Sequence, residues 1–191
     1  AKSATEKYDG TEKSVSGLME TTFTVEGNAY TVSGLTAEAK ATDAGTYTVN
    51  VTGTPVVMDA ADNDVTAQFS VTTKPGTLTI NKRTVTLTSG SANKEYDGTE
   101  LTKHEVTVGG EGFVTGEGAD YSYTGSQKLV GSSANYFTYT LKDGTKADNY
   151  NITTANGTLT VTNRDAQYEI TVTAKSATEK YDGTEKSVSG L

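Results

Sequence analysis

The chain begins and ends with the same stretch of sequence. Residues 1–18 (AKSATEKYDGTEKSVSGL) recur without change as residues 174–191. A long repeat with a wide spacing is typical of an array of similar modules and is foreign to a single catalytic domain. We therefore expect the 191 residues to cover one full repeat unit and the start of the next.

A second, weaker repeat divides the unit itself. Tyr-Asp-Gly, followed by Thr and Glu, occurs at Tyr8, Tyr96 and Tyr181, and Gly-Thr-Leu-Thr occurs at Gly76 and Gly157. This spacing predicts two divergent modules of about 80 to 90 residues, a common domain size. The predicted boundaries are a first β-module over residues 1–82, a second over residues 83–163, and the start of a third over residues 164–191.

Short runs of alternating apolar and polar residues predict strands along the whole chain. Thr is the most frequent residue, and its branched, polar side chain suits the wet face of a strand. Hydrophobic residues make up only 34% and Trp is absent, so the modules should have thin cores. The sequence predicts an all-β protein with strands at Thr22–Val25, Tyr30–Val32, Tyr47–Val51, Phe69–Val71, Leu78–Ile80, Val85–Leu87, Val106–Val108, Tyr121–Tyr123, Phe137–Tyr139, Leu159–Val161 and Tyr168–Val172.

The connection between the two modules is predicted to be short. The apolar residues Leu78 and Ile80 stand at even positions, and Val85 and Leu87 stand at odd positions. The face of the strand that is buried therefore changes near Lys82. A connector of a few residues leaves little freedom, which favours a semi-rigid stalk over a flexible tether.

The first module is expected to lack its first strand. The strand Tyr168–Val172 precedes the repeated segment at residues 174–191, and no such strand precedes Ala1. We therefore expect an open sheet edge at each end, and open edges invite strand addition. The expected partners are neighbouring repeats of the same chain, joined head to tail.

The charge argues against several classes of partner. Asp and Glu outnumber Lys and Arg by 24 to 16, which gives a net charge of −8. Nucleic acids and anionic membrane surfaces are bound by clusters of Lys and Arg, so neither is an expected partner. No apolar stretch approaches the ~20 residues of a membrane helix, so no membrane insertion is expected. The absence of Cys excludes disulfides.

One acidic segment is a candidate calcium site. Asp59, Asp62 and Asp64 place three carboxylates at nearby loop positions. Calcium takes oxygen ligands from flexible loops, although the segment lacks the glycine and the final Glu of an EF-hand. No other cofactor is predicted.

The residues needed for catalysis are scarce, so we predict that the chain is not an enzyme. His104 is the single histidine, and no Ser lies in a nucleophile-elbow pattern. The glycines at Gly110–Gly118 precede no helix and carry two Glu, which opposes phosphate binding. Tyr-Asp-Gly is interpreted as a structural turn, because Asp-Gly tolerates positive φ. An amide crosslink between Lys and Asn is a further hypothesis, and it requires a buried Lys, an Asn and an acid in contact.

Several segments resemble one family of bacterial surface repeats. They are Lys7–Thr11, Lys94–Leu101, Val65–Val71, and Asn149–Ile152 leading to Gly157–Val161. Together they are similar to the YDG/MBG-type tandem repeats of large adhesin-like cell-surface proteins of Gram-positive bacteria. The resemblance implies a secreted, extracellular protein that is attached to the cell wall through regions outside these residues. It implies no catalytic residues.

A smaller resemblance concerns the fold. Asp43–Tyr47 (DAGTY) is similar to the tyrosine corner of immunoglobulin domains. We therefore expect tandem small antiparallel β-sandwich modules of the Ig-like type. The alternative is a β-grasp module, whose helix would have to come from Thr36–Thr42.

Two functions remain open from the sequence. The first is a structural stalk or spacer that projects another domain from the cell. The alternative is an adhesive module that binds a host glycan or a matrix or mucus protein. The candidate glycan-binding face consists of Tyr121, Tyr123, Tyr136 and Tyr139.

Overall fold

The protein is all-β, as the sequence predicts. The computed structural model describes residues 1–191 and contains fifteen strands, two short 3-10 helices and no α-helix. No helix is long and apolar enough to cross a membrane. Strand pairs stay within residues 1–82 or within residues 83–163, which we call the N-terminal unit and the C-terminal unit.

The N-terminal unit is built from two groups of strands. One sheet has the order β1-β7-β5, and the other has the order β2-β4-β3 with β6 also paired to β4. The elements are β1 (Ala4–Lys7), β2 (Lys13–Ser16), β3 (Thr22–Val25), β4 (Asn28–Ala41), β5 (Gly45–Val49), β6 (Val51–Asp59), η1 (Thr66–Gln68) and β7 (Gly76–Asn81).

The C-terminal unit contains three small sheets. Their orders are β10-β8-β14, β11-β13 and β12-β15-β9. The elements are β8 (Arg83–Ser89), β9 (Ala92–Glu95), β10 (Val106–Gly110), β11 (Ala119–Tyr123), β12 (Gly131–Ala134), β13 (Phe137–Leu141), η2 (Ala147–Asn149), β14 (Tyr150–Ala155) and β15 (Thr158–Thr162).

Three of the five sheets are mixed, whereas antiparallel pairing alone was expected from the sequence; the β11-β13 sheet and the β2-β4-β3 sheet with β6 are antiparallel throughout. β1 runs parallel to β7, β9 runs parallel to β15, and β8 runs parallel to β14. The reason is the path of the chain, which enters and leaves each unit in the same direction. The early and late strands of a unit therefore lie side by side with the same polarity.

Three segments differ from their expected structure. Thr36–Thr42, the only candidate for a β-grasp helix, is strand β4 up to Ala41, since it pairs with β2 and β6. Phe69–Val71 and Tyr168–Val172 alternate like strands but form none. An alternating segment needs a neighbouring strand for its backbone hydrogen bonds, and neither segment has one.

The core is thin and crosses from one unit to the other. Only 18 of the 191 residues are buried, so each unit relies on a few central side chains. β7 and β8 supply four of the buried hydrophobic side chains, at alternate positions that point inward, as the change between even and odd positions at Lys82 predicts. The largest buried cluster consists of Tyr8, Ala37, Val49, Leu78, Ile80, Val85, Leu87 and Tyr150.

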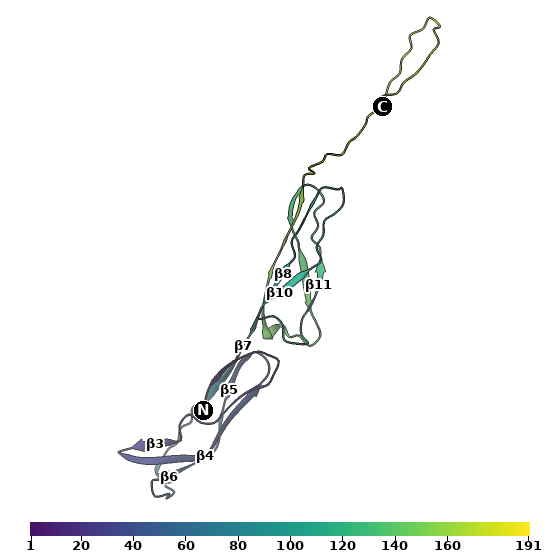
Figure 1. Ribbon diagram of the computed structural model, residues 1–191. Coiled ribbons are helices and arrows are strands. Elements are labelled where there is room, and N and C mark those ends of the chain that lie inside the picture. The colour runs from purple at the N-terminus through teal and green to yellow at the C-terminus, as the bar shows by residue number, and fades with distance from the viewer.

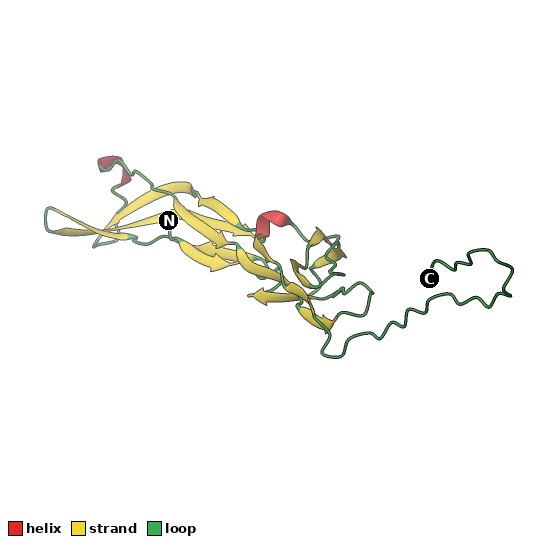
Figure 2. Ribbon diagram, turned by 90° about the horizontal axis from the view of Figure 1, so that it is seen from above, coloured by secondary structure: helices red, strands yellow, loops and turns green.

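The two units lie end to end as a rod, and residues 164–191 extend beyond the far end of the C-terminal unit (Figures 1 and 2). We call these residues the tail. The tail has no strand, yet its turn copies the turn near the N-terminus. Asp182 accepts hydrogen bonds from Thr184 and Lys186, as Asp9 does from Thr11 and Lys13.

Candidate functional site: the joint between the two units

The joint begins with a connector of one residue. β7 ends at Asn81, β8 begins at Arg83, and only Lys82 lies between them. The Arg83 guanidinium folds back onto the C-terminal unit, where Nε donates to the Gly112 carbonyl at 2.8 Å and Nη2 to the Glu111 carbonyl at 2.7 Å. This fixes the direction in which β8 leaves the connector.

Tyr8 places an aromatic ring of the N-terminal unit against the C-terminal unit. It follows β1, its backbone N–H donates to Asn81, and only 4% of its surface is exposed. Its ring meets the Tyr150 ring edge to face, with centroids 5.6 Å apart, and Tyr150 meets Phe113 in a similar way at 5.1 Å. Edge-to-face pairs of this kind stabilise beyond the burial of their area.

Glu117 ties the two tyrosines together. Its carboxylate accepts a hydrogen bond from the Tyr8 hydroxyl and another, at 2.9 Å, from the Tyr150 hydroxyl. The Tyr150 oxygen in turn accepts the Val114 amide at 3.0 Å. Burial and the neighbouring carboxylate raise the pKa of Tyr8 to about 12, and burial raises the pKa of Tyr150 to about 12. Both hydroxyls therefore stay protonated and donate at neutral pH.

Gly10 allows the two units to approach closely here. It adopts φ +81°, which favours glycine, and an added Cβ would lie 2.9 Å from Val114 Cγ1. The Asp-Gly turn predicted from the sequence is therefore confirmed, with Asp9 accepting the Thr11 amide at 2.9 Å. The turn also has a second role, because it presents Tyr8 to the neighbouring unit.

A polar contact forms a second point of attachment. Asp43 accepts from Lys146 Nζ at 2.6 Å and from Asn149 Nδ2 at 2.9 Å, and Asn149 Oδ1 accepts the Ala44 amide at 2.7 Å. Asn149 is 1% exposed. The Lys146 ammonium group lowers the pKa of Asp43, so the carboxylate stays charged at neutral pH. The tyrosine corner holds this loop, since the Tyr47 hydroxyl donates to the Asp43 carbonyl at 2.9 Å as predicted.

An ion pair forms a third point. Lys7, at the end of β1, pairs with Glu111 of the C-terminal unit, and this pair lowers the pKa of Glu111 to about 2. Glu111 also accepts the Thr84 amide at 3.0 Å. Three separate contacts around a one-residue connector resist both bending and twisting.

The predicted calcium residues do not form a common site. The Asp59 carboxylate accepts the amides of Ala61 and Asn63, and the Asp64 carboxylate accepts the amide and hydroxyl of Thr66. Asp62 adopts φ +59° in the same turn. No group of three His, Cys, Asp or Glu side chains is arranged to hold a metal ion. The carboxylates serve instead to stabilise two turns.

The four candidate tyrosines are only partly brought together. Tyr121 and Tyr139 lie opposite each other on β11 and β13, and Tyr121 packs against the core cluster. Tyr123 lies two residues further along β11 and stacks on His104 with centroids 4.9 Å apart. Tyr136 precedes β13 and is 60% exposed. Much of this face is therefore used for packing.

The acid, amide and amine of the joint resemble the set needed for a Lys–Asn crosslink. Lys146 and Asn149 both contact Asp43. However, the Lys146 side chain is 64% exposed, and Asp43 raises its pKa. Attack on an amide needs a neutral amine, so this arrangement favours an ion pair.

Sequence reasoning did not find the joint. Tyr8 and Asp43 of the N-terminal unit are far in the sequence from their partners Glu117, Asn149 and Tyr150, and no shared motif links the two groups. The available signal was the short connector at Lys82, which forces the facing ends of the two units into contact. Comparison of the chain with family models, with curated proteins and with solved structures found no match.

Proposed function

We propose that this chain is a non-catalytic structural repeat that acts as a stalk or spacer in an adhesin-like surface protein of bacteria. The observation that carries the proposal is the joint. A one-residue connector, a buried pair of tyrosines and two polar contacts hold the units in line. A spacer needs this property, because it must keep its length while carrying another domain away from the cell.

The other features of the chain agree with this role. The net charge of −8 and the Thr-rich surface favour solubility over nucleic-acid binding. The resemblance to YDG/MBG-type repeats supports an extracellular location and attachment to the cell wall through other regions. The units over residues 1–82 and 83–163 are then the building blocks of the stalk.

The rigidity of the joint is testable by distance measurement between the units. The chain has no cysteine, so spin labels can be placed at Thr48 and Thr140, which are exposed in the two units. Pulsed electron paramagnetic resonance should give a narrow distance distribution. Combined Tyr8→Ala and Asp43→Ala substitutions should broaden it. Asp120→Ala is the matched control, since Asp120 pairs with Lys142 within one unit.

A broad distribution in the unmodified chain would refute the proposal of a rigid spacer. The alternative, adhesion, is tested by screening the same chain against glycans and matrix or mucus proteins. A saturable interaction that Tyr139→Ala abolishes would favour an adhesive module, because the Tyr139 side chain is exposed on β13 opposite β11.

A further inference from the structure

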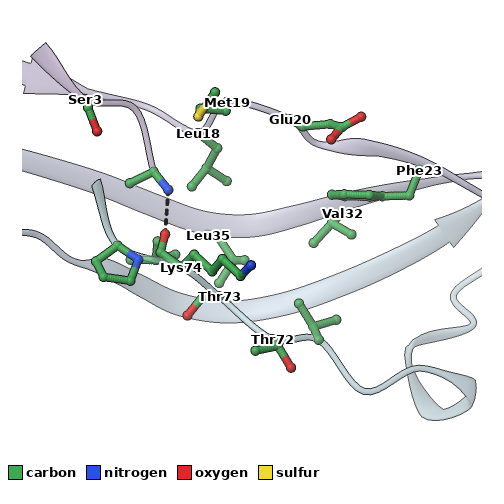
Figure 3. Close-up of a pocket in the computed structure, with 14 residues that line it drawn as sticks. Ser3, Leu18, Met19, Glu20, Phe23, Val32, Leu35, Thr72, Thr73 and Lys74 are labelled. Carbon is green, nitrogen blue, oxygen red and sulfur yellow. Dashed lines mark hydrogen bonds between the residues drawn. The ribbon is translucent and has the colours of Figure 1, made fainter. Parts of the chain in front are cut away.

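The N-terminal unit contains a long apolar groove with no strand in it. One part has a volume of about 510 Å³, and an adjoining part has about 220 Å³. The two parts share Phe23, Val32, Val71 and Thr72, so they form one continuous channel. Figure 3 shows Phe23 and Val32 above Thr72 and Thr73 in the first part.

Both walls of the groove have free backbone edges. Leu18–Glu20, just before β3, lines one wall and forms no strand. Phe69–Pro75, on the opposite wall, forms no strand. At one end of the groove the amino group of Ala1 donates to the Lys74 carbonyl at 2.7 Å, which is drawn dashed in Figure 3. This backbone contact shows that residues 69–74 are able to accept hydrogen bonds from a strand that continues along the groove.

The C-terminal unit shows what fills the equivalent space. Its sheet β10-β8-β14 places β8 between the two walls, antiparallel to β10 and parallel to β14. Val85 and Leu87 of β8 are 1% and 0% exposed. β8 is thus the central strand of that unit.

The two units correspond residue by residue in this region. Ser3 accepts the Thr77 amide at 3.0 Å, and Ser91 accepts the Thr158 amide at 2.9 Å. An added Cβ at Gly76 would meet the Lys2 carbonyl, and one at Gly157 would meet the carbonyls of Ser89 and Gly90. Residue 1 therefore stands where β8 ends, and residues 69–74 stand where β14 lies. The groove is the vacant place of a β8-like strand.

The tail carries a strand of the right sequence. Counted back from Tyr-Asp-Gly, Ile170 and Val172 stand before Tyr181 where Val85 and Leu87 stand before Tyr96. Tyr168, Ile170 and Val172 are 58%, 84% and 65% exposed, so most of the surface of three alternate apolar side chains is open to solvent, and only Tyr168 has a close neighbour, the Arg164 guanidinium 4.1 Å from its ring centroid. Alternate apolar side chains lie on one face of an extended segment, which leaves its backbone edges free to pair when the strand docks by edge addition.

The tail of one molecule does not reach its own groove. It leaves the end of the C-terminal unit that is remote from the N-terminal unit (Figure 1). A second copy of the chain, in contrast, can bring its tail to this groove.

We propose that the groove binds Tyr168–Thr173 of a second copy as a strand, parallel to residues 69–74 and antiparallel to residues 18–22, which correspond to β10 because Lys2 donates to Gly17 as Gly90 donates to Glu105. The β8–β14 pairing sets the register, with Arg83 opposite Tyr150, Val85 opposite Ile152 and Leu87 opposite Thr154. By correspondence, Tyr168 lies opposite Phe69, Ile170 opposite Val71 and Val172 opposite Thr73. The contact is head to tail, so it generates open chains of molecules. It is separate from the joint and does not depend on the joint's rigidity.

The first test is self-association of the full chain by sedimentation velocity over a range of concentrations. We expect oligomers that grow with concentration. Ile170→Asp, which puts a charge on the docking face, should weaken association by about tenfold or more, since burying an apolar side chain of this size contributes at least that much. Thr171→Asp is the matched control, because it adds the same charge to the outward face and should leave association unchanged.

A complementation test examines the acceptor side. Val71→Asp should also prevent association, and mixing it with Ile170→Asp should restore one interface only, giving dimers and no longer chains. Ile170 is exposed, so Ile170→Asp and Thr171→Asp decide the question even where Val71→Asp does not fold. A wild-type chain that stays monomeric, or equal association of the Ile170→Asp and Thr171→Asp variants, would overturn the proposal.

The register is tested by crosslinking. A chain with Val71→Cys and Ile170→Cys should form a ladder of disulfide-linked oligomers on oxidation, because the two residues are opposite each other in the proposed ladder. A chain with Ser70→Cys and Ile170→Cys is out of register by one residue and should crosslink much less. Equal crosslinking of both chains would contradict the register.

A rival arrangement is exchange of residues 174–191 with the identical residues 1–18 of another copy. A chain that ends at Thr173 keeps the proposed strand and removes the exchanged segment. We expect this shortened chain to associate as the full chain does. Loss of association on this truncation would show that exchange, and not strand docking in the groove, joins the molecules.

Discussion

The three copies of Tyr-Asp-Gly allow one substitution to be compared in three surroundings. Tyr8 is 4% exposed in the joint, Tyr96 is partly buried at the far end of the C-terminal unit, and Tyr181 is 97% exposed in the tail. Each tyrosine begins the same five residues, Tyr-Asp-Gly-Thr-Glu, and Tyr→Ala removes the same atoms at each site. The difference between the three variants therefore measures what the joint adds to the stability of the chain.

The expected magnitudes follow from burial. A buried aromatic side chain covers about 150–250 Å², which at ~25 cal/mol per Å² is roughly 4–6 kcal/mol, and aromatic-to-Ala changes in cores cost about 3–5 kcal/mol. Tyr8→Ala should therefore destabilise the chain by about 4 kcal/mol. Tyr181→Ala should change the free energy of unfolding by less than about 0.5 kcal/mol. Tyr96→Ala should lie between them.

Tyr8→Phe separates the hydroxyl from the ring. The Tyr8 hydroxyl donates to the charged Glu117, and hydrogen bonds to charged groups contribute about 1.5–3 kcal/mol. This part of the loss should appear in the Phe variant, while the ring contact with Tyr150 is kept.

Urea denaturation followed by circular dichroism measures these values at protein concentrations where the chain is monomeric. The wild-type chain should unfold in one transition, since its two units share a buried cluster. Tyr8→Ala should separate the unfolding of the two units into two transitions. If Tyr8→Ala costs no more than Tyr181→Ala, the two units do not stabilise each other through this tyrosine, and the reasoning is refuted.

Three further predictions concern other parts of the structure. Folding raises the pKa of Tyr8 from 10.0 to about 12, so the unfolded chain loses this proton first as the pH rises. Stability from this group should thus be complete below pH 10 and decline up to about pH 12, and Tyr8→Phe should make the decline in a pH series of melting temperatures shallower. Gly157→Ala should cost at least ~2 kcal/mol by chemical denaturation, because its Cβ would lie 2.4 Å from a β8 carbonyl oxygen. Gly144→Ala, at φ +85° in open space, should cost only about 1 kcal/mol, and equal losses would contradict the close contact. Calcium should leave the melting temperature unchanged, because the Asp59 and Asp64 carboxylates already accept backbone amides; a rise in melting temperature that Asp59→Ala removes would contradict this.

Local features of the fold were predictable from the sequence. The change from even to odd apolar positions at Lys82 predicted the buried faces of the two strands on either side of it. The tyrosine-corner segment was also recognisable, and the Tyr47 hydroxyl donates to the Asp43 carbonyl as in such a corner. Each of these depends on residues within a few positions of one another. The alternation of apolar and polar residues predicted which side chains of a strand are buried for the same reason, because it also depends only on neighbouring residues.

Features that depend on distant partners were not predictable. Tyr8 was interpreted only as part of a turn, since its contacts lie on Glu117 and Tyr150 of the other unit. Phe69–Val71 alternates as a strand does and yet forms none, because no other strand pairs with it. An alternating sequence indicates that a segment is able to form a strand. Whether the strand forms depends on a second strand being available to pair with it.

The parallel pairing of early and late strands has a mechanical consequence. Tension that enters at the start of β1 and leaves at the end of β7 pulls these two parallel strands in opposite directions along their length, and the same holds from the start of β8 to the end of β14. In this geometry all hydrogen bonds of a ladder carry load together and must break together, whereas a hairpin pulled from its open end loses them one by one. The parallel pairing of the first and last strands of each unit therefore favours resistance to stretching.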